Sequence, residues 1–423
     1  METTVAPRGA ETGRDFGLLW SGQTLSVGGT AVSSVALPIV ATSVLNASTF
    51  EVALVAAAGS AAWLVFGLPS GVWVDRMPRR RLMLAMETLR GCAILSIPVA
   101  WATGVLSLAQ LVTVALMVGA AGVFFDVALQ TYLPAVVPPQ ALLRANSRLQ
   151  GSESVAQVGG PALGGILVQW VGAPFALLAD AASYAVSAAC LTGMRRHEET
   201  LSRAPSAGLR SEMLLGLRFV RRHPVLRPLT ISATLLNFSG AGLEALAVVF
   251  LVRTVQVSPG TVGVVLVGLG LGGVLGAAVA SRLCDRLGTV RTLFLTVTAG
   301  PLLTLLIPLT EPGAGLLAFA VGTTSISACM VVFSIVARSY RQRVVPSSLL
   351  GKVTATVRFV SWGALPVGAL VAGALGELLG NRGALWVVSA SFLLSSVPLL
   401  MSPLRRTPEL PSPEPVTAAP EQR

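Results

Sequence analysis

Several acidic and basic side chains lie inside long apolar stretches of this chain, where charge is rare. They are Glu87, Arg90, Asp126, Glu153, Asp180, Glu244 and Arg358. Glu87 and Arg90 are three residues apart, so in a helix they share a face and can form an ion pair. A charge within a membrane is unfavourable and usually functional, so these positions are the first candidates for carrying or binding an ion.

The chain has few residues that could form a metal site, a cofactor site or an enzyme active site. The chain has two histidines and four cysteines, with no CxxC pair, so we expect no metal site and no cofactor. The string from Gly268 to Gly273 matches the glycine pattern of dinucleotide sites. It lies inside an apolar stretch without a βαβ unit, so helix packing explains it better. We see no P-loop, HExxH or GxSxG motif and therefore expect no enzyme.

The elements that must position these charges are membrane helices. Hydrophobic residues make up 53% of the 423 residues and charged residues only 12%, which predicts an all-α membrane protein. Twelve apolar stretches are long enough to cross a bilayer. They lie near 16–45, 51–74, 82–103, 106–131, 149–171, 173–194, 228–252, 258–281, 292–310, 312–336, 352–377 and 383–403.

The positive charge of the chain follows the gaps between these stretches. If the amino terminus is cytoplasmic, nearly all of the 30 basic residues fall in cytoplasmic segments, and only Arg253 and Arg382 fall outside. The positive-inside rule therefore predicts that both termini are cytoplasmic, and it explains the net charge of +11 without a nucleic-acid partner.

The chain also repeats itself at an offset close to half its length. Asp75-Arg76 recurs as Asp285-Arg286, and Arg81 recurs as Arg291. Such an offset predicts two six-helix halves in the same orientation, related by an axis along the membrane normal. The predicted division is an amino-terminal tail (1–15), an N-terminal bundle (16–194), a linker (195–227), a C-terminal bundle (228–403) and a disordered tail (404–423). Within the linker, residues 209–222 predict an amphipathic helix, lying either on the membrane surface or in solvent.

The loop after the second stretch carries the most specific pattern. Gly71, Asp75, Arg76, Arg79 and Arg80 match the loop signature of the major facilitator superfamily, which the chain resembles over about residues 16–403, with Pro78 in place of a second glycine. A degenerate copy holds Asp285, Arg286 and Arg291. The resemblance implies a charge cluster that latches one half against the other during transport. A plain positive-inside anchor is the alternative interpretation.

A second pattern lies in the fifth stretch. Gly160, Pro161, Gly164 and Gly165 resemble the signature of the antiporter branch of that superfamily, although Ala156 replaces its leading glycine. Small residues permit close helix contact, so generic packing is the alternative. Further short strings resemble exporters of the enterobactin and macrolide type. Thr30 stands where many of these proteins carry an acid, so proton coupling would have to use another residue.

The resemblance also implies which charges face a central cavity. Stretches one, four, seven and ten line it in this superfamily, which favours Asp126 and Glu244 as cavity acids and makes Asp180 a scaffold residue. The candidates for proton coupling are Asp126, Glu244, Arg90, Glu153 and Arg358. The candidates for substrate contact are Gln23, Phe124, Asn237, Phe238 and Trp362.

Together these patterns predict a secondary active transporter of the bacterial inner membrane. We expect a monomer that exports a small amphipathic molecule by proton antiport and alternating access. The substrate could be a drug, a siderophore or a natural product, and the sequence does not distinguish these classes. The alternatives are an importer or uniporter of the same fold, or a membrane-embedded lipid-handling protein.

Overall fold

The computed structural model describes residues 8–67, 69–74, 77–138, 141–194 and 209–406, and all regular structure within these ranges is helical. The long helices of the first part are α1 (Arg8–Ile39), α2 (Thr49–Phe66), α4 (Arg79–Ala102), α5 (Leu108–Val136), α6 (Leu142–Val171) and α7 (Ala173–Gly193), with the short α3 (Pro69–Val74) after α2. The second part holds α9 (Leu226–Val249), α10 (Pro259–Leu287), α11 (Thr289–Thr304), α12 (Leu316–Val344), α13 (Ser347–Leu393) and α14 (Val397–Leu400). The prediction of an all-α protein is confirmed.

Ten helical segments of the described chain are long and apolar enough to cross a bilayer. One of them, Leu349–Leu400, has 52 residues and would extend roughly 78 Å if straight, more than twice the bilayer core. Gly380 breaks it with φ 70 and ψ 163, so it makes two crossings. The 30-residue α6 is also long enough, although its first turns are more polar. With these two, the twelve predicted crossings are present.

The sequence repeat is visible in the backbone. Both α1 and α9 end in a π-helical turn, η1 (Val40–Val44) and η3 (Phe250–Thr254). Each turn is followed by a residue with positive φ, Asn46 or Gln256, and then by a serine that caps the next helix. Gly172 and Gly380 share the same unusual conformation between the last two helices of each half. The two halves therefore repeat local geometry as well as helix order.

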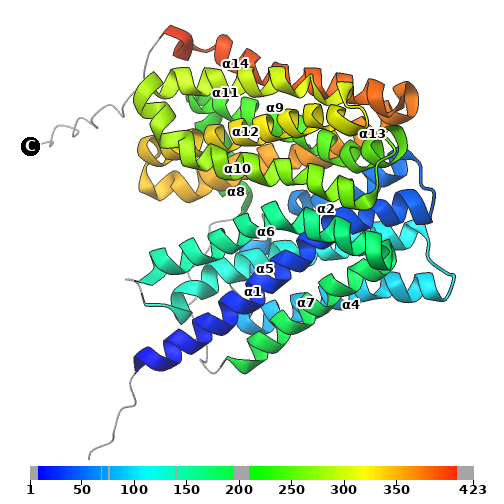
Figure 1. Cartoon of the computed structure of the whole chain (residues 1–423). Helices are drawn as coiled ribbons and strands as arrows, with labels where there is room; N and C mark the ends of the chain where they lie inside the picture. The colour runs from blue at the N-terminus through cyan, green and yellow to red at the C-terminus, as the bar shows by residue number, and fades with distance from the viewer. Residues whose placement is uncertain (1–7, 68, 75–76, 139–140, 195–208, 407–423) are drawn as a thin grey trace, which may run out of the picture.

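Figure 1 shows the N-terminal half below the C-terminal half, with α8 (Leu209–Arg222) at the side where the halves connect. We call that side, which carries α8, the start of α4 and the end of α7, the linker end. The opposite side, with η1, η3 and Gly380, is the distal end. Between the halves, α6 packs on α10 and α2 packs on α13.

Within the linker, the structure has a helix, α8, over Leu209–Arg222. Gly216 lies directly against the Lys352 carbonyl of α13, and Val220 is buried, whereas Arg218, Arg221 and Arg222 are exposed. The described part of α8 therefore packs one face on the C-terminal half and turns its arginines outward. The exact domain boundaries stay predictions.

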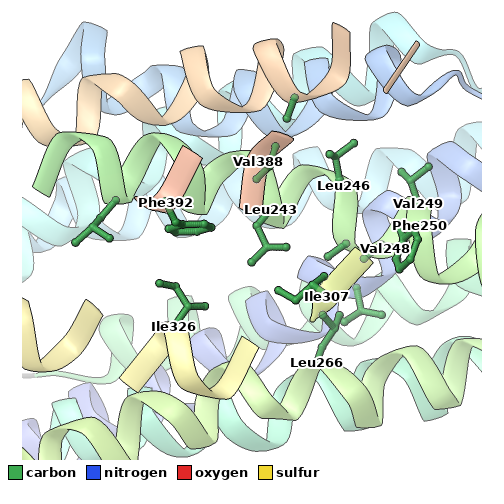
Figure 2. Close-up of a cluster of buried hydrophobic side chains, with 14 of the residues drawn as sticks. Leu243, Leu246, Val248, Val249, Phe250, Leu266, Ile307, Ile326, Val388 and Phe392 are labelled. Atoms are coloured by element: carbon green, nitrogen blue, oxygen red, sulfur yellow. The ribbon is translucent and has the colours of Figure 1, made fainter. Parts of the chain in front are cut away.

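The interior of the C-terminal half is apolar. Figure 2 shows Leu243 of α9 on the side of Ile326 of α12 and Phe392 of α13, with Phe250 of η3 at the other end of the same apolar cluster. Phe250 and Phe392 are fully buried. In a membrane such contacts stabilise through close packing, because lipid chains are as apolar as the side chains themselves.

Candidate functional site

The glycine-rich motif of α6 lies where three helices meet. A Cβ at Gly160 would collide with Ala31 of α1, and a Cβ at Gly164 would lie 3.1 Å from the backbone of Val32. Gly165 faces the other half, where a Cβ would lie 2.9 Å from Cα of Gly263 in α10. The backbone oxygen of Pro161 also touches Gly263. The motif thus gives α6 close contact with its own half and with the opposite half.

At the distal end, hydrogen bonds join the two halves. The Thr49 hydroxyl donates to Asn381 Oδ1 (2.8 Å), and the Phe50 N–H donates to Glu377 Oε1 (2.9 Å). Arg253, in the π-helical turn η3, donates to the Thr42 carbonyl in η1 (3.0 Å). A π-helical turn leaves carbonyls without their usual helical partners, which makes them available to the opposite half. The halves are therefore closed against each other at this end.

A cavity of about 480 Å³ lies between the halves, toward the linker end. Helices α2 and α5 form one wall and α13 forms the other. Its lining residues are Trp63, Gly67, Val127, Leu350, Gly351, Thr354, Ala355, Arg358, Phe359 and Trp362. Of the predicted residues, Arg358 and Trp362 line this cavity.

Aromatic and charged groups meet at the wall of this cavity. The Trp63 and Trp362 rings are in edge-to-face contact across the halves, with centroids 4.6 Å apart. The Arg358 guanidinium lies 4.9 Å from the Trp362 ring centroid, a cation–π contact. Asp126 on α5 lies within electrostatic range of Arg90 in its own half and of Arg358 in the other. Asp126 is thus within electrostatic range of one cation from each half.

The remaining candidates for substrate contact lie elsewhere. Phe124 stacks on Trp73 within the N-terminal half, with centroids 5.7 Å apart. The half-buried Gln23 carries an Oε1 with no hydrogen-bond partner among the described atoms. The Asn237 amide donates to the Ala233 carbonyl (2.9 Å), and the Phe238 backbone packs against Gly368. None of these four residues lines the 480 Å³ cavity.

Two further candidate acids are exposed. Glu153 on α6 accepts a hydrogen bond from Gln150 (2.9 Å) and lies within electrostatic range of Asp126. Glu244 lies midway along α9 and makes no hydrogen bond or ion pair with the described residues. The structure therefore groups Glu153 with Asp126, Arg90 and Arg358 and leaves Glu244 apart.

The loop motif is only partly described. Gly71 lies in α3, and Asp75 and Arg76 fall outside the described residues. Arg79 donates to the Thr131 carbonyl of α5 (3.1 Å), and Arg80 donates to the Leu191 and Thr192 carbonyls at the end of α7 (both 2.8 Å). These arginines tie α4 to α5 and α7 within one half. In the degenerate copy of the motif, Asp285, Arg286 and Arg291 are exposed at the linker end.

A buried polar network inside the N-terminal half combines the predicted candidate Arg90 with two acids, Glu87 and Asp180, that were not given a site role from the sequence. Glu87 is fully buried and pairs with Arg90 (3.4 Å), which confirms the predicted ion pair. Asp180 on α7 is 1% exposed and accepts hydrogen bonds from Ser33 and Ser183. The spacing of Ser26, Thr30 and Ser33 places three hydroxyl groups on one face of α1. This pattern could have indicated a polar interior beside α1.

Comparison with known proteins then decides the family. The sequence model described as "Transmembrane secretion effector", of the major facilitator superfamily (MFS), matches residues 3–421. The chain belongs to this superfamily. It is therefore a multi-pass MFS transporter of the lipid bilayer that binds small molecules, and it is not an enzyme.

The relatives of this transporter include efflux proteins. It is 28% identical over 375 residues to the multidrug efflux pump Tap of Mycolicibacterium fortuitum, covering 84% of this chain and 86% of Tap. It is 30% identical over 302 residues to an uncharacterised MFS-type transporter of Sinorhizobium fredii, covering 70% and 72% of the two chains.

Solved structures share the fold. A mutant form of the nucleoside transporter NupG superposes with a TM-score of 0.77 at 10% identity, covering 91% of this chain and 99% of NupG. A bacterial homologue of the iron transporter ferroportin, in an inward-facing state, superposes with a TM-score of 0.72 at 19% identity, covering 92% and 98%. The MFS fold with two six-helix halves is thereby confirmed.

The glycine string of α10 is a packing element of this transporter. Gly268 and Gly272 lie against Thr324 of α12, and Gly270 lies against Gln157 and Val158 of α6. Alternate glycines thus serve contacts within and between the halves. Across the described part of the chain, no group of three or more His, Cys, Asp or Glu side chains lies close enough to hold a metal ion.

At the linker end, His223 fixes the start of α9. Its Nδ1 accepts hydrogen bonds from the backbone N–H groups of Val225 and Leu226 (both 3.2 Å). Partial burial lowers the pKa of His223 below its usual value. The neutral ring is the form that accepts these bonds.

Proposed function

We propose that this transporter exports a small amphipathic molecule across the bacterial inner membrane in exchange for protons. The likeness to Tap, which is named a multidrug efflux pump, supports export and a preference for drug-like substrates. We further propose that the protein works as a monomer with both termini in the cytoplasm, as the distribution of basic residues favours.

The observation that carries the proposal is the aromatic cavity between the halves. Trp63, Phe359 and Trp362 offer flat apolar surface, and Arg358 offers a single strong polar contact. Sites for small molecules are mostly apolar with few orienting polar groups. Because α2 and α5 face α13 across the cavity, a bound molecule would contact both halves at once and respond to their relative movement.

Alternating access then follows from the two ends of the molecule. The distal hydrogen bonds from Thr49, Phe50 and Arg253 must break for the cavity to open on that side. The links from Arg79 and Arg80 hold α4, α5 and α7 together, so the N-terminal half moves as one body. With the linker end in the cytoplasm, the described state accepts substrate from inside the cell. We propose that Asp75 and Asp285 latch the linker end in the opposite state.

Proton coupling in this proposal uses the charges near the cavity. Asp126 lies between Arg90 and Arg358, so its environment changes whenever the halves move apart or a substrate contacts Arg358. Glu153 and Glu244 are the further candidate acids. A nearby cation that comes and goes in this way changes how readily a carboxyl group holds a proton, so movement of the halves is linked to the protonation of the acids near Arg90 and Arg358.

Reconstituted vesicles test the proposal. Ethidium, an aromatic amphipathic cation, serves as the first probe, and its movement is followed by fluorescence with and without a pH gradient. We expect uphill export in wild type, and weaker ethidium transport in Trp362→Ala. Trp170→Ala is the matched control, since Trp170 is 79% exposed and away from the cavity. Accumulation toward the linker side, or equal transport in Trp362→Ala, would contradict the proposal.

Orientation has its own test. Single cysteines at Asn46 and Asn381, in a cysteine-free background, should react with an impermeant thiol reagent from outside intact cells. A cysteine at Gln342, exposed at the linker end, should react only after the cells are opened. The reverse pattern would place the linker end outside.

A further inference from the structure

The buried network of the N-terminal half brings together three helices. Ser26 on α1 donates to Glu87 Oε2 on α4 (3.3 Å), and Arg90 Nη1 contacts Glu87 Oε1 (3.4 Å). On α7, Asp180 accepts hydrogen bonds from Ser33 and Ser183. Glu87 is 0% exposed and Asp180 is 1% exposed, so neither carboxyl group meets solvent.

The charges of this network do not balance. The two carboxyl groups lie within electrostatic range of each other, and Arg90 is the cation within range of both. Tyr184 on α7 and Asp126 on α5 are the other titratable groups that face them or Arg90, and α1 contributes only hydroxyls. With both carboxyls ionised, one negative charge would be buried without compensation, which is strongly unfavourable at membrane depth.

Arg90 is loosely held. Its contact with Glu87 is long for a charged hydrogen bond, and its Nε is buried without a hydrogen-bond partner in the described structure. The guanidinium lies between the Phe125 and Tyr184 rings, 5.5 Å from each centroid. A cation held mainly by ring faces can shift toward Asp126 without breaking a bidentate ion pair.

Two further hydroxyl groups lie beside the network. The Tyr184 hydroxyl lies 2.9 Å from the Thr30 hydroxyl, and Thr30 donates to the Ser26 carbonyl (3.0 Å). Thr30 itself is exposed, unlike Ser26 and Ser33. Thr30 therefore links the buried Tyr184 hydroxyl to the exposed surface of α1.

We propose that Glu87 and Asp180 together bind the one proton that is exchanged for substrate, and that Arg90 is the positioning residue that controls its release. This inference rests on the proposed proton-coupled function. A proton from water on the distal side forms an O–H bond with a carboxyl oxygen of the pair. The same bond breaks when the proton leaves to water at the linker end, so no other reactant is needed.

The coupling follows from the position of Arg90. While Arg90 lies against Glu87, the pair carries less excess negative charge and releases its proton more readily. When Arg90 is drawn toward Asp126, the pair loses its cation and retains the proton. Asp126 lies near Arg358 at the cavity. A change at the cavity therefore alters the attraction between Asp126 and Arg90, and through Arg90 it alters how tightly the buried pair holds its proton.

Infrared spectroscopy of the purified protein tests the proposal directly. A protonated carboxyl group in an apolar site has its own C=O stretching band, which shifts in heavy water. We expect this band in wild type near neutral pH and its loss in Asp180→Asn and in Glu87→Gln. Both substitutions keep the hydrogen-bonding shape of the side chain. Glu311→Gln, at an exposed acid between α11 and α12, is the matched control and should retain the band.

Transport provides the second measurement. In vesicles, Asp180→Asn and Glu87→Gln should lose uphill export driven by a pH gradient and keep downhill exchange of ethidium, whereas Glu311→Gln should keep both. Retained downhill exchange also shows that the variants are folded. If the band and uphill export persist in both variants, the inference is wrong. If wild type itself ignores the pH gradient, proton coupling fails, while the infrared band still decides whether the pair holds a proton.

Discussion

The interior of the N-terminal half holds Glu87, Arg90 and Asp180, whereas the matching interior of the C-terminal half holds no charge at these positions. The offset that relates Asp75 to Asp285 relates Glu87 to Val297 and Arg90 to Gly300. The offset that relates Gly172 to Gly380 relates Asp180 to Val388. Val388 belongs to the apolar cluster of Figure 2.

Several buried hydroxyl groups of the C-terminal interior bond to the backbone or to each other. Ser232 donates to the Ser395 carbonyl (2.7 Å), and Ser239 pairs with Ser391 (2.7 Å). The same helix arrangement is thus stable without buried ions. Since burying an ion pair rarely stabilises more than apolar packing does, the fold alone does not explain the charges of the N-terminal half.

The largest effect on stability is expected when one partner of the buried ion pair is removed and the other is kept. Glu87→Val leaves Arg90 buried without its ion-pair partner, so the free energy of unfolding should fall by about 3–5 kcal/mol. Unfolding in mixed detergent, followed by tryptophan fluorescence, measures this change. Glu311→Gln is the control and should change little. A loss as small as that of the control would mean that Glu87 is not needed to stabilise the charge of Arg90.

The next effect concerns the surface that both halves share. Gly165→Ala and Gly263→Ala each force a Cβ into the facing backbone, and each should destabilise by about 1–3 kcal/mol and slow transport. Gly159→Ala, where no atom lies within 4 Å, is the control. The interiors of the two halves differ, but these two glycines face each other, so the two substitutions should cause similar losses of stability and transport. A clear difference between Gly165→Ala and Gly263→Ala would show that the halves contribute unequally to the interface.

A smaller net change in stability is expected when the N-terminal interior is made to resemble the C-terminal one. The triple variant Glu87→Val, Arg90→Met, Asp180→Val removes all three charges together and should regain most of the stability lost in Glu87→Val. It should exchange ethidium downhill and show no uphill export. If the triple variant unfolds as readily as Glu87→Val, the N-terminal fold needs its charges, and the comparison between the halves fails.

The smallest effect belongs to His223 at the start of the C-terminal half. Burial lowers its pKa below 6.5, so the stability from its neutral form is present above about pH 6.5 and is lost as pH falls through the lower folded value. Thermal unfolding between about pH 7 and about pH 5 should show a larger loss in wild type than in His223→Asn, whose amide accepts hydrogen bonds without titrating. Parallel curves would contradict this role.

Much of the fold could be predicted from sequence because it depends on local signals. Apolar length indicated the helices, the bounds of α8 followed from its alternating faces, and the spacing of Glu87 and Arg90 indicated their ion pair. Helical periodicity shows which residues share a face, but it does not show which helices are neighbours.

The site was harder to predict for that reason. Asp180 was assigned a scaffold role because its helix was not expected to face the cavity, and its burial beside Glu87 depends on the packing of α1, α4 and α7. The approach of Trp63 to Trp362 likewise depends on how the halves meet. Roles for Asp126, Glu153, Glu244 and the loop motif stay predictions.

The π-helical turns η1 and η3 show that the repeat includes a helix irregularity as well as the helices. The two turns occupy equivalent positions, and each is followed by a positive-φ residue, Asn46 or Gln256, and by a serine cap. In the C-terminal copy the turn carries Arg253, which donates to the Thr42 carbonyl in the N-terminal copy. The same repeated bend therefore supplies the donor in one half and the acceptor in the other, so two equivalent elements have complementary roles in a single contact.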